Sequence, residues 1–331
     1  MKIAVVGCGA VGSFYGAKLC RAGHEVHFLL RSDYDVVRER GVSIRSVDGD
    51  FAARPRAARA PEEIGHAELV LIALKTTAND QFPRLLPPLV GPHTAVLTLQ
   101  NGLGNEEQLA RLFPAEQILG GLCFVCLNRI APGLIQHMAH GLIVLGEYQR
   151  PASPRTHTLA EMFRQAGVPC NVTDNLARAH WEKLSWNIPF NGLGVAAAAG
   201  YDALIHPNPE AIRRAPRGPC LTTDRLLADP RWETLVRELM REVIAIAAAL
   251  GMPLREDLEQ WQITRTRRMG AYKPSTVLDF ELGRPLELES LFLLPLREAR
   301  RAGVSAPRLA ALCTVLEALA ETLPASAARR S

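Results

Sequence analysis

A polar stripe within an apolar segment is the first feature that points to chemistry. The segment WEKLSWNIPFNGLGV spans residues 181–195 and places Lys183, Asn187 and Asn191 four residues apart. Residues at this spacing share one face of a helix, so an ammonium and two amides would stand in a line. The stripe is a candidate ligand-binding face. The alternative is a solvated surface lysine followed by two polar residues near the end of a helix.

Lysine is scarce in this chain. Only five of its 38 basic Lys and Arg residues are Lys. A charge needed only for solvation would be supplied by Arg in such a composition. Lys, unlike Arg, can release a proton near neutral pH when its surroundings depress its pKa. Lys75, Lys183 and Lys273 lie next to candidate ligand-binding residues, and their retention favours functional roles.

A glycine-rich turn near the N-terminus predicts a dinucleotide site. The apolar run KIAVV precedes GCGAVG, which is followed by a helical pattern and the second apolar run EVHFLL. Gly7 permits a tight turn, Gly9 lets the backbone approach a pyrophosphate, and Gly12 lets the helix pack closely. The helix N-terminus offers unpaired N–H groups to phosphates. The predicted cofactor loop comprises Gly7, Cys8, Gly9, Ala10, Val11 and Gly12. A glycine-rich turn without a ligand is the alternative.

The end of the second strand bears on which cofactor binds. An NAD site places Asp or Glu there to hold the ribose hydroxyls. This chain has Arg31, whose planar guanidinium suits a 2′-phosphate, so we expect NADP(H). Asp33 and Asp35 follow closely and compete with this interpretation. Arg31 as a solvated loop residue is the alternative.

Two further apolar runs predict strands that end in polar residues. The run over 67–76 has Lys75 near its end, and the run over 94–102 contains Asn101. Ligands bind outside the carboxyl ends of parallel strands, so both side chains are expected at the ligand edge. QILGGLCFVCL predicts another strand, and LIQHMAHGLIVLGEY predicts a pair of strands closing the sheet.

Helical patterns dominate the second half of the chain. The fold expected is α/β, with a Rossmann-type dinucleotide-binding domain over 1–174 and a mainly α-helical substrate and catalytic domain over 175–331. Residues 207–230 are rich in Pro and Arg and predict a loop or a broken helix. Helices are expected near 175–199, 231–250, 254–270, 288–302 and 306–321.

Composition narrows the class of protein. A chain of 331 residues suggests two domains, and 48% hydrophobic with 22% charged residues is ordinary for a soluble globular protein. The net charge of +4 gives little support for a nucleic-acid partner. No apolar run suits a membrane helix, and we expect a cytoplasmic protein.

The seven cysteines and nine histidines show no metal-binding spacing. Cys123 and Cys126 form a CxxC within an expected strand, where residues three apart point to opposite faces. His137 and His140 have the same spacing in another strand-like segment. No metal is therefore expected, and the cysteines are interpreted as thiols in a reducing compartment.

Five motifs together resemble the ketopantoate reductase family. They are GCGAVG, Lys75 after a strand, QNGLG at 100–104, EKLSWNIPFNGL at 182–193 and KPSTVLDFELGRPLELE at 273–289. The resemblance spans nearly the whole chain. It implies a cleft between a Rossmann-type domain and a helical domain, and NADPH-dependent reduction of a 2-oxo acid. Ketopantoate, reduced to pantoate in pantothenate biosynthesis, is the first substrate expected.

The resemblance also implies roles for the residues of the stripe. Lys183 matches the family's general acid, and Asn187 and Asn191 match two substrate-binding amides. Glu287 matches the glutamate beside the nicotinamide and its ribose, where it could pair with Lys183. An ammonium suits this reaction because it stabilises charge on the carbonyl oxygen and then donates a proton. Exposure at the start of a helix is the alternative for Glu287.

Three further positions match family motifs. Asn101 corresponds to the asparagine that contacts both cofactor and substrate. Ser275 corresponds to the serine that holds the substrate carboxylate, although it could simply cap a helix after Pro274. Cys126 falls where the family has a backbone contact to the cofactor.

Departures from the family pattern surround the substrate residues. Pro189 lies between the two amides and would kink or end the helix, which would take Asn191 out of the stripe. Gly192 and Gly194 replace positions where the family has other residues. A dehydrogenase of another 2- or 3-hydroxy acid or an opine-like compound is one alternative. A non-catalytic NADP(H) sensor is another. A homodimer through the C-terminal domain is the assembly expected.

Overall fold

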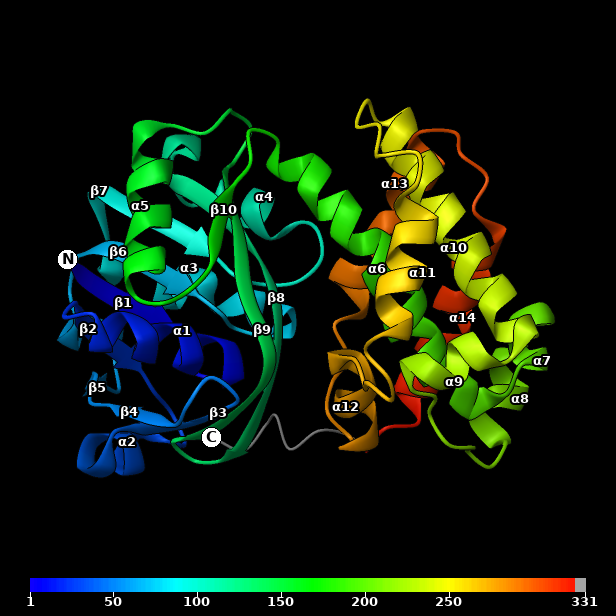
Figure 1. Cartoon of the computed structure of the whole chain (residues 1–331), viewed down its shortest axis with the longest axis horizontal. Helices are drawn as coiled ribbons and strands as arrows, with labels where there is room; N and C mark the ends of the chain where they lie inside the picture. Colours follow the sequence, from blue (N-terminus) through cyan, green and yellow to red (C-terminus); the bar gives the residue numbers. More distant parts are fainter. Residues whose placement is uncertain (325–331) are drawn as a thin grey trace. The chain divides into compact units, whose positions relative to one another are not determined.

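The computed structural model of the chain describes residues 1–324 (Figure 1). The chain divides into two compact units, Met1–Ala179 and a second unit that begins at His180. The division falls in the first turn of helix α6 (Leu176–Ala196), whereas the boundary expected from sequence lies just before this helix. Asn175 caps α6, because its Oδ1 accepts a 2.9 Å hydrogen bond from the Arg178 backbone N–H.

The first unit is built on one ten-stranded sheet with the order β4-β3-β9-β8-β7-β6-β1-β2-β5, and β10 pairs with β9. Neighbouring strands from β5 through β8 pair in parallel, which is the doubly wound Rossmann order. The order reverses between β1 and β6. The strands are β1 Lys2–Val6, β2 Glu25–Leu29, β3 Val42–Ser46, β4 Phe51–Ala53, β5 Arg56–Ala58, β6 Ala67–Ile72, β7 Val90–Thr98, β8 Ile118–Ala131, β9 Leu134–Glu147 and β10 Cys170–Val172.

Both faces of the parallel strands are buried, which explains their continuous apolar sequence. In β1, Ile3 and Val5 belong to one hydrophobic cluster, whereas Ala4 and Val6 belong to a second. The first cluster includes residues of α1 and α5, and the second includes residues of α3 and α4. The helices of this unit are α1 Ala10–Arg21, α2 Tyr34–Arg40, α3 Phe82–Leu85, α4 Asn105–Leu109 and α5 Pro154–Gln165.

The prediction of two strands over residues 134–148 is wrong. β9 is one strand of 14 residues that runs antiparallel to β8, which also has 14 residues. His140 has a φ of 64°, and the sheet accommodates it as an irregularity in register. His137 is buried and His140 exposed, as their spacing predicts.

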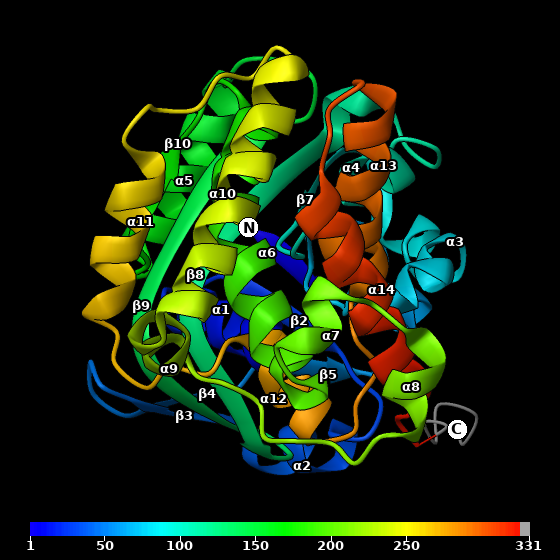
Figure 2. The ribbon, with the colours of Figure 1, turned by 90° about the vertical axis from the view of Figure 1, so that its right-hand side faces the viewer.

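The second unit is helical, as expected (Figure 2). Helix α10 packs against α9, α11, α13 and α14. The segment 207–230 is a broken helix, and α12 is an additional helix that the hydrophobic pattern does not mark. The helices after α6 are α7 Asp202–Ile205, α8 Pro209–Arg214, α9 Thr223–Ala228, α10 Pro230–Ala249, α11 Leu258–Arg267, α12 Ser275–Glu281, α13 Leu294–Arg301 and α14 Pro307–Glu321.

Glycines bring α6 close to its neighbours within this unit. A Cβ on Gly192 would lie 2.5 Å from the Leu312 side chain of α14, and one on Gly194 would lie 2.6 Å from Val277 of α12. These two departures from the family pattern are thus explained by helix packing. Within residues 1–324, no helix has the length and apolar character needed to cross a bilayer.

Candidate active site

The glycine loop after β1 has the geometry of a dinucleotide site. Gly7 has a φ of +96°, and a Cβ there would lie 2.3 Å from the Leu74 backbone nitrogen. A Cβ on Gly12 would lie 2.3 Å from the Gly7 carbonyl oxygen. Any side chain at either position would therefore push neighbouring backbone apart, so these glycines are required by the turn and by helix packing.

Gly9 differs from its two neighbours in the motif. It occupies the N-cap of α1, and a Cβ built on it would meet no atom within 4 Å apart from the adjoining chain. Its missing side chain therefore leaves space beside the N–H groups of Ala10 and Val11 at the start of a 12-residue helix. The loop fits a pyrophosphate in this respect.

Cys8 lies in the same loop but is not an ionised thiol. Burial raises the pKa of Cys8 well above its usual value, and the nearby Asp33 carboxylate raises it further. Its Sγ donates a 3.4 Å hydrogen bond to the Val5 carbonyl oxygen. Cys8 is therefore suited to contribute its backbone to the loop, without charge or nucleophilicity.

The two carboxylates after β2 are both engaged by arginines. Asp33 accepts hydrogen bonds from Arg129 and from the Gly133 N–H. Burial favours a higher pKa for Asp33, but the hydrogen bonds from Arg129 and Ser32 outweigh it and lower the pKa. Asp35 accepts two 3.1 Å hydrogen bonds from Arg59. Both carboxylates therefore belong to the protein's own hydrogen-bond network.

Arg31 lies at the carboxyl end of β2, and its side chain is exposed. An acidic residue that reads the ribose hydroxyls of NAD would normally stand near this position. The two carboxylates that follow, Asp33 and Asp35, bind Arg129 and Arg59.

Lys75 and Asn101 lie after adjacent parallel strands. Lys75 follows β6 and begins the 3₁₀ turn Thr76–Gln81, while Asn101 follows β7. The paired ends of β6 and β7 place both segments at the same edge of the sheet, as their positions in the sequence predict.

Cys126 belongs to the part of β8 that extends past this parallel pairing. The last pair between β7 and β8 is Thr98 with Gly120, and Cys126 pairs only with Ala139 of β9. It is buried, and it stands outside the hydrophobic cluster that Cys123 joins. Because a register irregularity follows Phe124, between the two cysteines, their opposite orientation stays a prediction from their spacing. Among the described residues, no His, Cys, Asp or Glu group suits a metal.

The polar stripe of Lys183, Asn187 and Asn191 lies on one continuous helix, α6. Pro189 lies inside α6, yet the helix continues to Ala196. Lys183, Asn187 and Asn191 therefore keep their common helical spacing. Lys183 is partly buried, whereas Asn187 and Asn191 are only 7% and 4% exposed.

The Asn187 amide has hydrogen-bonding capacity to spare. Within residues 1–324 its side chain makes no hydrogen bond, and its polar atoms are not fully enclosed. A recessed amide without a partner is costly unless water or a ligand satisfies it. Asn187 is therefore the strongest ligand-binding candidate of the stripe.

Asn191 has a structural contact that its spacing does not reveal. Its Oδ1 accepts a 3.1 Å hydrogen bond from the Thr276 N–H in the first turn of α12. The amide thus holds the helix that begins with Ser275. Ser275 is exposed, and Pro274 occupies the N-cap position, so the interpretation of Ser275 as an N-cap is wrong.

The two acids near the end of the last motif have different environments. Glu287 is only 6% exposed, while Glu289 is exposed and forms an ion pair with Arg297. Glu287 lies two residues before a π-helical turn, Glu289–Leu293, a feature often found at functional sites. Lys273 of the same motif makes 2.8 and 2.9 Å hydrogen bonds to Glu281, which indicates a structural role.

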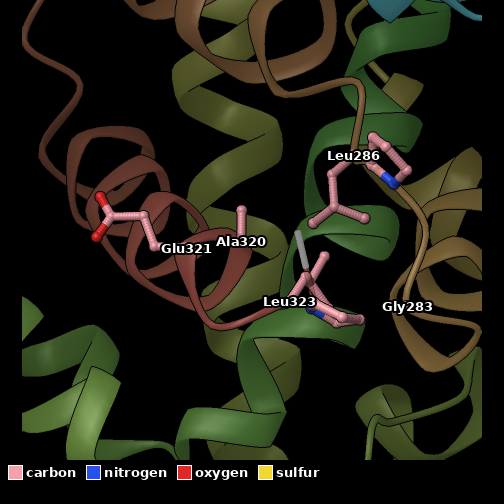
Figure 3. A pocket seen from close by; sticks show the side chains of 7 residues that line it. Gly283, Leu286, Ala320, Glu321 and Leu323 are labelled. Carbon is pink, nitrogen blue, oxygen red and sulfur yellow. The ribbon is translucent and has the colours of Figure 1, made fainter. Parts of the chain in front are cut away.

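A pocket in the second unit carries none of the predicted site residues. Figure 3 shows it near Leu286, Ala320 and Leu323. Its one ionisable lining residue, Glu321, pairs with Arg213 at 2.5 Å. The lining is otherwise apolar, and the pocket offers no group suited to proton transfer.

Comparison with known proteins identifies the family. The model described as ketopantoate reductase PanE/ApbA matches residues 3–150, and the model of the family's C-terminal part matches residues 220–320. The chain belongs to the ketopantoate reductase family. A 2-dehydropantoate 2-reductase from Nostoc sp. is 38% identical over 93% of this chain and 92% of its own.

Solved structures of ketopantoate reductases share the fold. The 2-dehydropantoate 2-reductase from Geobacter metallireducens superposes with a TM-score of 0.86 and 46% identity, covering 96% of this chain and 99% of its own. A D-mandelate dehydrogenase in complex with NADH and anilino(oxo)acetate superposes with a TM-score of 0.82 at 20% identity, covering 98% and 99%. The latter likeness concerns the fold alone.

Proposed function

We propose that this ketopantoate reductase family member reduces 2-dehydropantoate to pantoate with NADPH. One observation carries the proposal beyond family membership. Lys183 shares a helix face with Asn187, whose recessed amide has no protein partner among residues 1–324. A proton donor beside an amide with open hydrogen-bonding capacity suits a small oxygen-rich substrate.

The first unit supplies the cofactor groups in this proposal. The backbone of residues 7–12 would hold the pyrophosphate, and Arg31 would bind the 2′-phosphate. Lys75, Asn101 and the Cys126 backbone would contact the remainder of the cofactor. The bound nicotinamide supplies the hydride that reduces the substrate's carbonyl carbon.

The second unit supplies the proton and the substrate contacts. The Lys183 ammonium stabilises negative charge developing on the carbonyl oxygen and donates a proton to that oxygen. Its amine then regains a proton from solvent. Asn187 and the Nδ2 group of Asn191 would bind hydroxyl oxygens of the substrate, and the Ser275 hydroxyl would donate to its carboxylate. Glu287 would favour the charged form of Lys183.

Two Lys183 variants test the proposal. Both Lys183→Ala and Lys183→Arg should lower kcat roughly 10²–10⁴-fold, because Arg keeps the charge but does not release a proton near neutral pH. NADPH affinity, measured by its fluorescence on binding, should stay within about twofold of wild type. Unchanged turnover in Lys183→Ala would exclude the acid role and favour a sensor that only binds cofactor.

The substrate is tested by NADPH oxidation with a panel of 2-oxo acids. Ketopantoate should give the highest kcat/KM. A higher value for another acid would replace ketopantoate and leave the reaction class intact. NADH should be a poorer reductant than NADPH, as expected for Arg31 at the end of β2.

We also propose that the protein acts in the cytoplasm as a homodimer formed by its C-terminal unit. Leu282 of that unit is 60% exposed, and apolar surface of this kind is common at interfaces. Light scattering tests the assembly, and Leu282→Glu should shift a dimer towards monomer. A monomeric wild-type protein would contradict this assembly.

A further inference from the structure

Three buried amides form a chain at the edge of the sheet in the first unit. Gln100, Asn79 and Asn105 are 5%, 8% and 0% exposed. Gln100 follows β7, Asn79 lies in the 3₁₀ turn after β6, and Asn105 begins α4. Burying an amide side chain costs free energy unless its polar atoms are hydrogen-bonded. The hydrogen bonds of these three amides therefore matter to the fold.

Hydrogen bonds connect the three amides in sequence. Gln100 Nε2 donates to the Leu74 carbonyl oxygen at 3.0 Å and to Asn79 Oδ1 at 2.7 Å. Asn79 Nδ2 donates to Asn105 Oδ1 at 3.0 Å. Asn105 Nδ2 then donates to the Asn101 carbonyl oxygen at 3.1 Å. The chain therefore runs without a gap from one backbone carbonyl to another.

The orientation of every amide follows from the two ends. A carbonyl oxygen only accepts, so Gln100 must present its NH₂ group to Leu74. Its Oε1 then faces the Thr98 hydroxyl, which donates to it at 3.0 Å. Asn105 must likewise present its NH₂ group to Asn101, and Asn79 has one remaining orientation that satisfies both neighbours. The network thus admits a single arrangement.

The two anchored carbonyls belong to the segments that carry proposed cofactor ligands. Leu74 immediately precedes Lys75, and Asn101 is itself a proposed ligand. We propose that Gln100, Asn79 and Asn105 are positioning residues that fix the Lys75 and Asn101 segments for NADPH. They act through the backbone, and they hold two loops that follow neighbouring strands at one mutual setting.

This inference rests on the proposed use of NADPH, and isosteric variants test it. Gln100→Glu would set carboxylate oxygens against Leu74 O and Asn79 Oδ1, and Asn105→Asp would do the same at Asn101 O. Each should raise the KM and Kd for NADPH roughly ten- to hundredfold, because small misplacements of ligand groups are costly. At saturating NADPH, kcat should change less than about threefold, since the proton donor is elsewhere.

A matched control exists in the same unit. Gln117 is also buried, and its Nε2 donates to the carbonyl oxygens of Gly91 and Thr94 at 2.8 and 3.0 Å. Gln117→Glu creates the same clash with two carbonyls, away from Lys75 and Asn101. It should lower the Tm to a similar extent while leaving the KM for NADPH unchanged. Equal effects of Gln117→Glu and Gln100→Glu on the KM would overturn the inference.

The remaining outcomes are separated by binding measurements on wild-type protein. If wild type binds no NADPH in calorimetric titration, the proposed cofactor is wrong. If wild type binds NADPH and the folded variants bind it equally well, the positioning role is wrong. If Gln100→Glu does not fold, Asn79→Ala removes only the middle amide and should still raise the Kd for NADPH. A normal Kd in that variant would overturn the inference.

Discussion

At the scale of single residues, Asn187 and Asn191 are identical side chains on one helix face that differ in their hydrogen bonding. The Asn187 side chain makes no hydrogen bond within residues 1–324, whereas the Asn191 side chain accepts one from the Thr276 N–H. The sequence predicts both amides and their common face. It does not predict that α12 approaches one of them, because that contact joins residues 85 positions apart.

We expect Asn187→Ala to raise the KM for ketopantoate about tenfold with a change in unfolding free energy below ~0.5 kcal/mol. Asn191→Ala should also weaken substrate binding, and it should cost about 1–2 kcal/mol because a helix N–H loses its acceptor. Urea unfolding followed by tryptophan fluorescence reports this difference, since all four Trp residues lie beyond position 180. Equal stability of the two variants would contradict the assignment.

The carboxylates after β2 also have partners that the sequence does not predict. In sequence, Asp33 and Asp35 compete with Arg31 for the interpretation of the cofactor. In the structure, Arg129 engages Asp33 and Arg59 engages Asp35. Arg129 lies 96 residues from Asp33, so no local pattern could have paired them.

At the scale of elements, the glycine loop separates what folding needs from what a ligand needs. Gly9→Ala should leave the Tm unchanged, because apart from the adjoining chain no atom lies within 4 Å of the added Cβ. It should raise the Kd for NADPH at least about tenfold, since the methyl group would occupy the space offered to phosphate. Gly12→Ala should lower the Tm, because its Cβ would lie 2.3 Å from a backbone oxygen.

Thermal unfolding and NADPH titration of the two variants provide the measurement. A loss of stability in Gly9→Ala similar to that in Gly12→Ala would mean that Gly9 serves the fold. The motif predicts a role for each of the three glycines. The distances from a Cβ built on each one to its neighbours show that the fold itself requires Gly7 and Gly12.

The sequence predicts the long helices and strands better than it predicts where they break. The apolar pattern predicts α6, α10 and α14 closely, because each has a long buried face. Pro189 suggests a break in α6 that does not occur, since packing on Ile188 and Phe190, both fully buried, maintains the helix. The segment expected to form two strands is the single strand β9, because its pairing with β8 continues on both sides of the irregularity at His140.

At the scale of the whole molecule, one buried carboxylate joins the end of β9 to the start of α5 in the first unit. The Glu147 side chain is fully buried at the end of β9. It accepts hydrogen bonds from Ser153 and Thr156 at 2.7 and 2.6 Å, and it pairs with Arg150 and Arg155. Burial opposes ionisation, but these hydrogen bonds outweigh it and lower the pKa of Glu147.

This depressed pKa predicts the acid sensitivity of the first unit. A lowered folded-state pKa stabilises the protein above the unfolded-state value of about 4.3, and this stability is lost as pH falls through the folded-state pKa. Glu147→Gln should cost about 3 kcal/mol at pH 7, because it leaves Arg150 and Arg155 without their counterion. The difference from wild type should shrink at pH values below the folded-state pKa.

Hydrogen exchange of β9 and α5 as a function of pH measures the effect locally. A variant whose stability differs from wild type by the same amount at every pH would show that Glu147 is not ionised in the folded protein. The sequence predicts neither the burial of Glu147 nor its four partners, because its own strand pattern marks it only as the end of an apolar run.

The division of the chain into two consecutive units has a consequence for synthesis. All ten strands of the first unit precede its last residue, Ala179, so a ribosome releases the complete sheet before it releases Lys183. Domains generally fold as units during translation, and a ligand that binds only the folded state stabilises it, increasingly as its concentration rises above the Kd. A nascent chain can therefore acquire its nucleotide-binding half, and cellular NADPH can stabilise that half, before the residue that donates the proton has been made.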